Sequence, residues 1–217
     1  MARIWGAMGY GCLLLWMAGS AVPCVAAGPH TQVKDYRGRP TFFLDGQPYT
    51  RPLFATYHPL EKYYRQMAQA GIEVFNFQTN CAWDVYGHGK PTWPTPDVWD
   101  FTQIDKRARA ILRARPDAYI LPRIYISAPP WWLDRHPDEL MVLDHGGTTF
   151  REPYVDTVAP KGRRYGSLLS QTWRKAMGQA LARTVRHMMD SPWGDRIFGF
   201  EISALATEEW YYWTSNQ

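Results

Sequence analysis

The chain has 217 residues, of which 46% are hydrophobic and 20% are charged, and this balance excludes a disordered or collagen-like protein. Its 24 basic and 20 acidic residues leave a net charge of +4. The basic residues are spread along the chain and form no stripe interleaved with aromatic side chains, so the composition argues against a nucleic-acid partner.

The first residues have the features of an export signal. Arg3 supplies a positive charge, residues 7–22 are apolar, and the small residues 25–27 provide a cleavage site. This order predicts a signal peptide over residues 1–27 and a secreted or periplasmic mature chain. A retained anchor is the alternative. Because glycines and Pro23 interrupt the apolar stretch, however, no stable membrane span is expected after cleavage.

Cysteine usage limits the chemistry of the mature chain. Cys12 and Cys24 lie within the expected signal, which leaves Cys81 alone. A single cysteine forms no internal disulfide, and the scattered histidines lack the spacing of metal ligands. The sequence therefore predicts neither a metal site nor a cofactor.

A β-hairpin is expected at the start of the mature chain, within residues 28–50. The dipeptide Asp45-Gly46 separates residues 41–44 from residues 47–49. Asp-Gly between two strand-like segments favours a two-residue turn. We therefore expect a short hairpin segment before the main domain.

From residue 51 onwards, strand-like and helix-like segments alternate. The expected strands are residues 53–57, 72–77, 119–126 and 197–202. Apolar residues at helical spacing predict three helices: one from Leu60 to Gly71, one that opens near Thr102 with Asp105 at capping-box spacing, and one from Trp173 to Met188.

This alternation indicates an α/β fold with a parallel sheet. We expect residues 51–217 to form about four βα units, a partial (β/α)₈ TIM barrel, since the whole fold normally needs about 250 residues. Sites in such barrels lie where the carboxyl ends of the strands open into loops. The chemistry of this chain is therefore expected in the loops that follow its strands.

Those loops carry most of the polar and aromatic residues that a core does not explain. His58 follows the first expected strand, while Asn76, Asn80 and Trp83 lie at the end of the second. A lone His or Asn is either an ordinary hydrogen-bonded residue or a ligand contact. The eleven Trp and thirteen Tyr either fill a large core or stack on sugar rings in a cleft.

Two adjacent acids, Glu208 and Glu209, follow the last expected strand and precede the aromatic residues 210–213. Apolar walls raise the pKa of a carboxyl group, which can then protonate a glycosidic oxygen near neutral pH. Glu209 is the first candidate because it directly precedes the aromatic run, of which Trp210 is an expected substrate contact. The alternative is the acid-rich first turn of a helix. Glu201 lies inside the strand and could line the barrel floor.

Residues 127–140 read Ser-Ala-Pro-Pro-Trp-Trp-Leu-Asp-Arg-His-Pro-Asp-Glu-Leu. This stretch resembles glycoside hydrolase family 42, the β-galactosidase family, whose third strand leads into Pro-Pro-x-Trp-Leu and His-Pro-Glu-type segments. Residues 81–83, 99–105 and 163–174 are similar to further elements of that family, in the same order. The resemblance covers most of residues 72–202.

The resemblance implies a retaining glycoside hydrolase that acts on β-linked sugars in oligo- or polysaccharides. In that mechanism one carboxylic acid protonates the leaving oxygen, and a second carboxylate, about 5–5.5 Å away, forms the glycosyl-enzyme intermediate. In related barrels the nucleophile sits on strand seven, so the resemblance also implies that this chain alone is inactive. The alternative function is a secreted carbohydrate-binding protein without chemistry.

Four further residues are candidate ligand contacts. Trp131 and Trp132 are expected sugar platforms, with one of the two in the core. By resemblance, one of Arg163 and Arg164 reaches the site and steadies the acids, although a surface salt bridge is an equal alternative. The chain departs from the family at the end of strand four, where no Asn precedes the two acids. That Asn holds the 2-hydroxyl of the sugar in the family, so the departure indicates a divergent branch.

Overall fold

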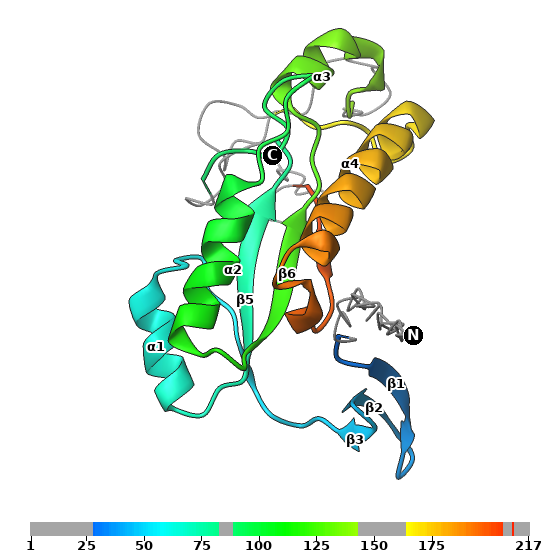
Figure 1. Ribbon diagram of the computed structural model, residues 1–217. Helices are drawn as coiled ribbons and strands as arrows, with labels where there is room; N and C mark the ends of the chain where they lie inside the picture. The colour runs from blue at the N-terminus through cyan, green and yellow to red at the C-terminus, as the bar shows by residue number, and fades with distance from the viewer. Residues whose placement is uncertain (1–27, 83–88, 143–163, 206–209, 211–217) are drawn as a thin grey trace, which may run out of the picture.

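The computed structural model describes residues 28–82, 89–142, 164–205 and residue 210. Two sheets organise these residues, an antiparallel sheet of three strands and a parallel sheet of four. Figure 1 shows the small sheet near the start of the chain and the long helices packed along the larger sheet. The fold is mixed α/β, as the sequence predicts.

The small sheet consists of β1 (Thr31–Tyr36), β2 (Arg39–Leu44) and β3 (Gln47–Pro48). Both of its turns use two consecutive residues with positive φ, Arg37-Gly38 (56° and 76°) and Asp45-Gly46 (48° and 78°). This conformation is that of a type I′ turn, which matches the twist of paired strands. The predicted hairpin around Asp45-Gly46 is confirmed. The sequence does not predict β1, because five of its six residues are exposed and no apolar alternation marks it.

The parallel sheet has the order β4 (Leu53–Phe54), β5 (Val74–Asn80), β6 (Tyr119–Tyr125) and β7 (Glu201–Ser203). β5 and β6 pair along their full length, and every residue of β5 is buried. All four strands overlap the segments that the alternating pattern predicts, although β4 and β7 are shorter. At the start of the expected fourth strand, Ile197 makes only an isolated bridge to Ile120.

Three helices pack along the parallel sheet: α1 (Glu61–Gln69), α2 (Thr102–Ala114) and α4 (Gln171–Asp190). Gly71, just after α1, has a φ of +90°, the left-handed conformation that commonly follows a helix. Ser170 caps α4, because its Oγ accepts a hydrogen bond from the backbone N–H of Trp173 at 2.8 Å. Across the described ranges, no helix combines the length and the apolar character needed to span a membrane.

The capping box expected at the start of α2 is wrong. Thr102 is the first helical residue, and its backbone N–H donates to Oδ1 of Asp100 at 2.9 Å. Asp105 instead points towards the end of α4. There its Oδ1 lies 3.1 Å from Nε2 of His187 and accepts a hydrogen bond from Nε1 of Trp193 at 3.3 Å. Asp105 therefore joins two helical regions that are far apart in the sequence.

The long loop expected after β6 contains a short helix, α3 (Pro130–Arg135), and a 3₁₀ turn, η1 (Pro137–Glu139). Both begin with proline, which is favoured at a first helical position because no N–H is needed there. A second 3₁₀ turn, η2 (Gly194–Arg196), connects α4 to β7. Three-residue turns and a six-residue helix are too short to give a helical repeat in the sequence.

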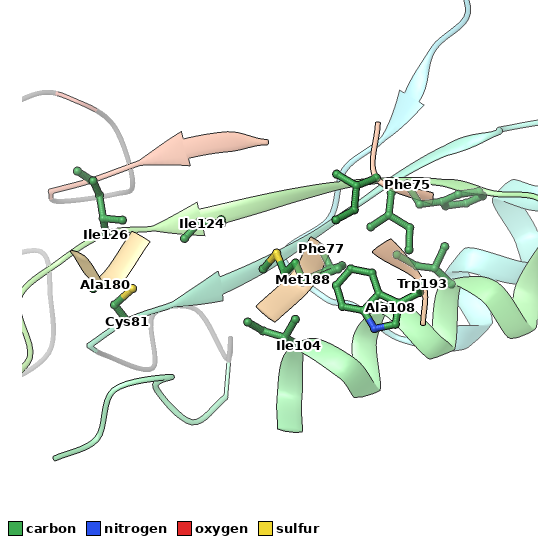
Figure 2. Close-up of a cluster of buried hydrophobic side chains, with 14 of the residues drawn as sticks. Phe75, Phe77, Cys81, Ile104, Ala108, Ile124, Ile126, Ala180, Met188 and Trp193 are labelled. Atoms are coloured by element: carbon green, nitrogen blue, oxygen red, sulfur yellow. The ribbon is translucent and has the colours of Figure 1, made fainter. Parts of the chain in front are cut away.

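The main core lies between the parallel sheet and the helices (Figure 2). Phe75 and Phe77 of β5 and Ile124 of β6 point towards the helices and are fully buried. They share a cluster with Ile104 of α2 and Met188 of α4. The apolar residues of the strands therefore alternate onto the helix-covered face, which leaves the other residues for the opposite face.

The small sheet packs against the amino-terminal end of the parallel sheet. The ring of Phe198 lies 4.8 Å from that of Phe42 and 5.5 Å from that of Tyr49. Phe198 also contacts Tyr119, the first residue of β6, with ring centroids 6.1 Å apart. These aromatic contacts cover the end of the sheet at which its strands begin. The carboxyl ends of the strands lie at the opposite end, next to the longer connections.

An ion-pair cluster joins α1 to α2. Oε1 of Glu61 accepts a hydrogen bond from Arg65 at 3.1 Å, and its Oε2 accepts two from Arg113 at 2.8 and 3.0 Å. The hydrogen bonds from Arg65 and Arg113 lower the pKa of Glu61 below its usual value of 4.5. The folded chain therefore binds fewer protons at this position than the unfolded chain does.

We expect acid to weaken this cluster. Because folding lowers the pKa of Glu61, its ionised carboxylate contributes fully to the free energy of unfolding at pH values above its pKa in the unfolded chain. This contribution is lost as the pH falls through the pKa in the folded chain. The urea midpoint of the Glu61→Gln variant should lie below that of the wild type at about pH 6 and approach it at about pH 3. A difference that stays constant over this range would contradict the assignment.

Candidate functional site

Polar side chains occupy the face of the parallel sheet that the helices do not cover. The strand register places Gln78, Arg123 and Glu201 in one row across β5, β6 and β7. Two residues further along the strands, Asn80, Tyr125 and Ser203 form a second row. We define the polar face as these six residues together with Asn76, which precedes Gln78 on the same side of β5.

Glu201 of β7 lies at the end of the first row. Its Oε1 lies 3.2 Å from Nε of Arg123, and its Oε2 accepts a hydrogen bond from Nδ2 of Asn76 at 3.3 Å. The same Asn76 amide group donates to the carbonyl oxygen of Leu121 at 2.9 Å. The Glu201 side chain is 45% exposed, whereas that of Arg123 is 17% exposed. Because the acid and the base balance, the polar face carries no net charge.

The second row lies at the carboxyl ends of the strands. The Tyr125 hydroxyl donates to the carbonyl oxygen of Leu205 at 2.7 Å, and Nδ2 of Asn80 donates to the carbonyl oxygen of Gly89 at 3.4 Å. Leu205 has a φ of +67°, a conformation that residues other than glycine rarely adopt. The hydroxyl of Tyr125 therefore holds a sharp turn just after β7.

Several buried acceptors of the polar face have no hydrogen-bond partner among the described residues. They are Oδ1 of Asn76, Oε1 of Gln78, Oδ1 of Asn80 and Oγ of Ser203. Leaving one buried polar group unpaired costs about 1–3 kcal/mol, so such groups are rarely left without water or a ligand. Three of the four are amide oxygens, which accept hydrogen bonds only. This face can therefore accept hydrogen bonds from water or from a ligand that presents several donors.

Four of the predicted site residues lie outside the described residues: Glu208, Glu209, Trp83 and Arg163. The described residues that flank the two acids are Leu205, held by Tyr125, and Trp210. Nε1 of Trp210 donates to the carbonyl oxygen of Ile202 at 2.8 Å, while its side chain remains largely exposed. Both flanking residues therefore contact the carboxyl end of the sheet.

The two neighbouring tryptophans of α3 have different environments. Trp132 is only 3% exposed, and its ring stacks on that of His136 with centroids 4.1 Å apart. This packing makes Trp132 a core residue with no ring face open to a sugar. Trp131 is partly buried: it contacts the ring of Trp93 at 4.7 Å, donates from Nε1 to the Trp93 carbonyl at 3.3 Å and carries the Arg135 guanidinium over its ring at 5.4 Å.

Arg164 and His58 contact residues other than those of the polar face. Arg164 forms an ion pair with Asp134 of α3, and both side chains are partly exposed. This placement is the surface salt bridge that the sequence leaves open for it. His58 lines a cleft of about 680 Å³ between residues 57–61 and the side of α2 that carries Lys106. Asn80, by contrast, belongs to the polar face.

The described part of the chain contains one free cysteine and no cluster of metal ligands. Within these ranges, no three side chains of His, Cys, Asp or Glu gather closely enough to hold a metal ion. Cys81 is buried beyond the end of β5, and this burial raises the pKa of its thiol to about 11. A thiol with such a pKa stays protonated and is a poor nucleophile near neutral pH.

Sequence reasoning missed most of the polar face. The candidates did not include Arg123, Tyr125 or Gln78. The neighbours of these residues across the sheet depend on the strand register, which the sequence alone does not determine. One signal was present in β5. Asn76, Gln78 and Asn80 alternate with residues that face the core, and this period of two is typical of a strand with one polar face.

Comparison with solved structures gives a partial likeness. No protein-family model matches the sequence, and no curated protein matches it significantly. Among solved structures, the fold is similar to part of a β-galactosidase from the psychrophilic Marinomonas ef1, with 15% sequence identity and a TM-score of 0.48. The match covers 69% of this chain and 20% of that enzyme. The chain therefore spans about a fifth of the length of that structure, and the likeness is weak.

Proposed function

We propose that the polar face binds a β-linked sugar and that the chain is the N-terminal part of a β-galactosidase-like (β/α)₈ glycoside hydrolase. The observation that carries this proposal is the group of buried acceptors on Asn76, Gln78, Asn80 and Ser203 that have no partner among the described residues. Sugar hydroxyls supply several donors that such a surface can accept. The balanced pair of Arg123 and Glu201 favours a neutral ligand over a charged one.

In this proposal, Glu209 or Glu208 donates the proton to the leaving oxygen of the sugar. The contacts of Leu205 and Trp210 with the carboxyl end of the sheet support a role for the acids near the polar face. Retaining hydrolysis needs a second carboxylate about 5–5.5 Å from the first. By resemblance, that nucleophile belongs to strand seven of a barrel, whereas the described sheet has four strands. The 217-residue chain is therefore expected to bind sugar without hydrolysing it.

The aryl-glycoside assay tests the catalytic part of the proposal. Purified chain should release no nitrophenol from 4-nitrophenyl β-D-galactopyranoside above the rate of a buffer control. Turnover that the Glu209→Gln substitution abolishes would mean that this chain also contains the nucleophile. Turnover that survives both Glu209→Gln and Glu208→Gln would contradict the role of the two acids.

A carbohydrate-binding protein without chemistry is the second candidate. It is favoured by the kind of groups on the polar face, which are amides, hydroxyls and a neutralised ion pair rather than a free acid and a free base. The two candidates differ in the role of the acids after β7. Sugar binding that Glu209→Gln and Glu208→Gln leave unchanged, together with absent turnover, would favour the second.

Export is a separate part of the proposal. A leader over residues 1–27 places the mature protein outside the cytoplasm, as the charge, the apolar stretch and the cleavage site of that segment suggest. The amino-terminal sequence of protein recovered from the culture medium or periplasm tests this proposal. It should begin at Gly28.

Asn80 gives a quantitative test of binding. Replacing it with Ala removes an acceptor at the carboxyl end of β5, and loss of one hydrogen bond should weaken the binding of lactose about fivefold. Isothermal titration calorimetry measures the change. Gln69→Ala is the matched control, because Gln69 is an exposed amide on α1. Equal affinities of the Asn80→Ala variant and the wild type would remove Asn80 from the site.

A further inference from the structure

Glu201 differs from the other residues of the polar face in being both charged and accessible. Its carboxylate is held from two sides, by Arg123 on β6 and by Asn76 on β5. Arg123 comes from β6, the strand beside β7, and Asn76 comes from β5, one strand further, so the orientation of the carboxylate depends on the register of all three strands. Its side chain is nevertheless nearly half exposed.

The hydrogen-bonding capacity of this carboxylate is not exhausted. An ionised carboxylate has about four acceptor sites. Arg123 and Asn76 each occupy one oxygen, Oε1 and Oε2 respectively. Counting the contacts with described residues, at least one acceptor site on each oxygen therefore remains for a ligand. Two adjacent acceptors of this kind match two neighbouring hydroxyl groups, such as those of a vicinal diol.

The neighbours of Glu201 suit the same kind of ligand. Gln78 lies in the same row and Ser203 lies in the next row of β7, and each has a buried oxygen without a partner among the described residues. Rows on one face of a strand are about 7 Å apart, at roughly 3.3 Å per residue. A single sugar ring is long enough to contact both rows.

The polar groups around Glu201 suit a hydrogen-bond acceptor. The guanidinium of Arg123 and the amide N–H of Asn76 both interact favourably with the ionised carboxylate. A carboxylate held in this way accepts hydrogen bonds from hydroxyl groups. This role is distinct from the acid role proposed for Glu209 or Glu208.

We infer that Glu201 is a specificity-determining residue whose carboxylate accepts hydrogen bonds from two adjacent hydroxyls of the bound sugar. Arg123 and Asn76 are positioning residues that hold the carboxylate in place. This inference rests on the proposed sugar-binding function. It goes beyond that function by naming the group that distinguishes sugars by the positions of their hydroxyls.

Calorimetric titration with lactose tests the inference on the full chain. The Glu201→Gln substitution keeps the size of the side chain and removes its charge, and we expect affinity for lactose to fall about tenfold or more, since hydrogen bonds to charged groups are the stronger ones. Glu73→Gln is the matched control. Glu73 pairs with Arg115 at 3.6 Å, but it precedes β5 at the opposite end of the sheet, so its replacement should leave affinity unchanged.

Deoxy sugars identify the hydroxyls that donate hydrogen bonds to Glu201. Among lactose analogues that each lack one hydroxyl, two with neighbouring deoxy positions should bind the wild type more weakly than lactose. The Glu201→Gln variant should bind these two analogues about as tightly as it binds lactose. In this variant the carboxylate that would accept a hydrogen bond from the missing hydroxyl is already replaced. Should Glu201→Gln fail to fold, Glu201→Asp gives the same comparison, since it keeps the charge and withdraws the carboxylate from the ligand.

The outcomes distinguish failure of the proposed sugar-binding function from failure of the inference about Glu201. A wild-type chain that binds neither lactose nor its analogues would overturn the proposed function and this inference together. Wild-type binding of lactose with unchanged affinity in Glu201→Gln would overturn only the inference. Equal weakening by Glu201→Gln and by the control Glu73→Gln would also overturn it, because the effect would then be one of general stability.

Discussion

The Phe77→Ala variant should lose about 3–5 kcal/mol of unfolding free energy, because the substitution removes a large buried ring. Phe77 is fully buried in the centre of β5, and its ring lies 6.5 Å from that of Trp193 in an edge-to-face arrangement. It belongs to the cluster that joins β5 to α2 and α4. The surrounding sheet and helices cannot all move to fill the cavity that this substitution leaves.

Urea unfolding followed by circular dichroism measures this loss. Val33→Ala in β1 is the control, because Val33 is 68% exposed, and surface substitutions of this kind usually change stability by less than about 0.5 kcal/mol. A domain of ordinary stability has only about 5–15 kcal/mol, so Phe77→Ala should be close to unfolding. A loss below about 1 kcal/mol would contradict the core described between the sheet and the helices.

Gly194→Ala should have the second-largest effect. A Cβ at this position would lie 2.2 Å from the carbonyl oxygen of Met189 and 2.8 Å from its carbonyl carbon. Both are backbone atoms near the end of α4, so the helix end itself would have to move. We expect a loss of about 1–3 kcal/mol or more, as for other overpacked sites.

Replacing Gly178, a glycine within α4, should have the opposite effect on stability. A Cβ at Gly178 meets no atom within 4 Å, and alanine is favoured over glycine inside a helix by about 0.5–1 kcal/mol. Gly178→Ala should therefore stabilise the protein while Gly194→Ala destabilises it, as measured by the thermal midpoint. Two changes of the same sign would contradict the described turn between α4 and β7.

The sequence predicted the secondary structure best where a local signal was strong. Asp45-Gly46 identified the hairpin, Gly71 marked the end of α1, and the apolar spacing from Trp173 to Met188 located α4. The short elements were missed because their stabilising contacts are not local. β1 depends on its pairing with β2, and α3 depends on buried side chains such as Trp132.

The candidate site was predictable only in part. The carboxyl ends of the strands were expected to carry it, and Asn80 lies there as expected. Arg123 was passed over because a charged residue in a strand shows no partner in the sequence. Its contact with Glu201 spans 78 positions and depends on the register of β6 against β7. The roles of Glu208 and Glu209 stay predictions, because both lie outside the described residues.

The difference between Trp131 and Trp132 has a similar cause. Adjacent residues on a short helix point in different directions, so one ring of such a pair faces the core while the other does not. The sequence gives no reason to choose between them. Packing against His136 assigns the core role to Trp132, whereas Trp131 is only partly buried.

The central claim is that a β-linked sugar binds to the polar face, and a nuclear magnetic resonance titration with lactose tests it most directly. The side-chain amide signals of Asn76, Gln78 and Asn80 should shift in a saturable way as lactose is added, while that of Gln103, which lines the separate cleft beside His58, should not. Shifts confined to Gln103, or a spectrum that lactose leaves unchanged, would contradict the account.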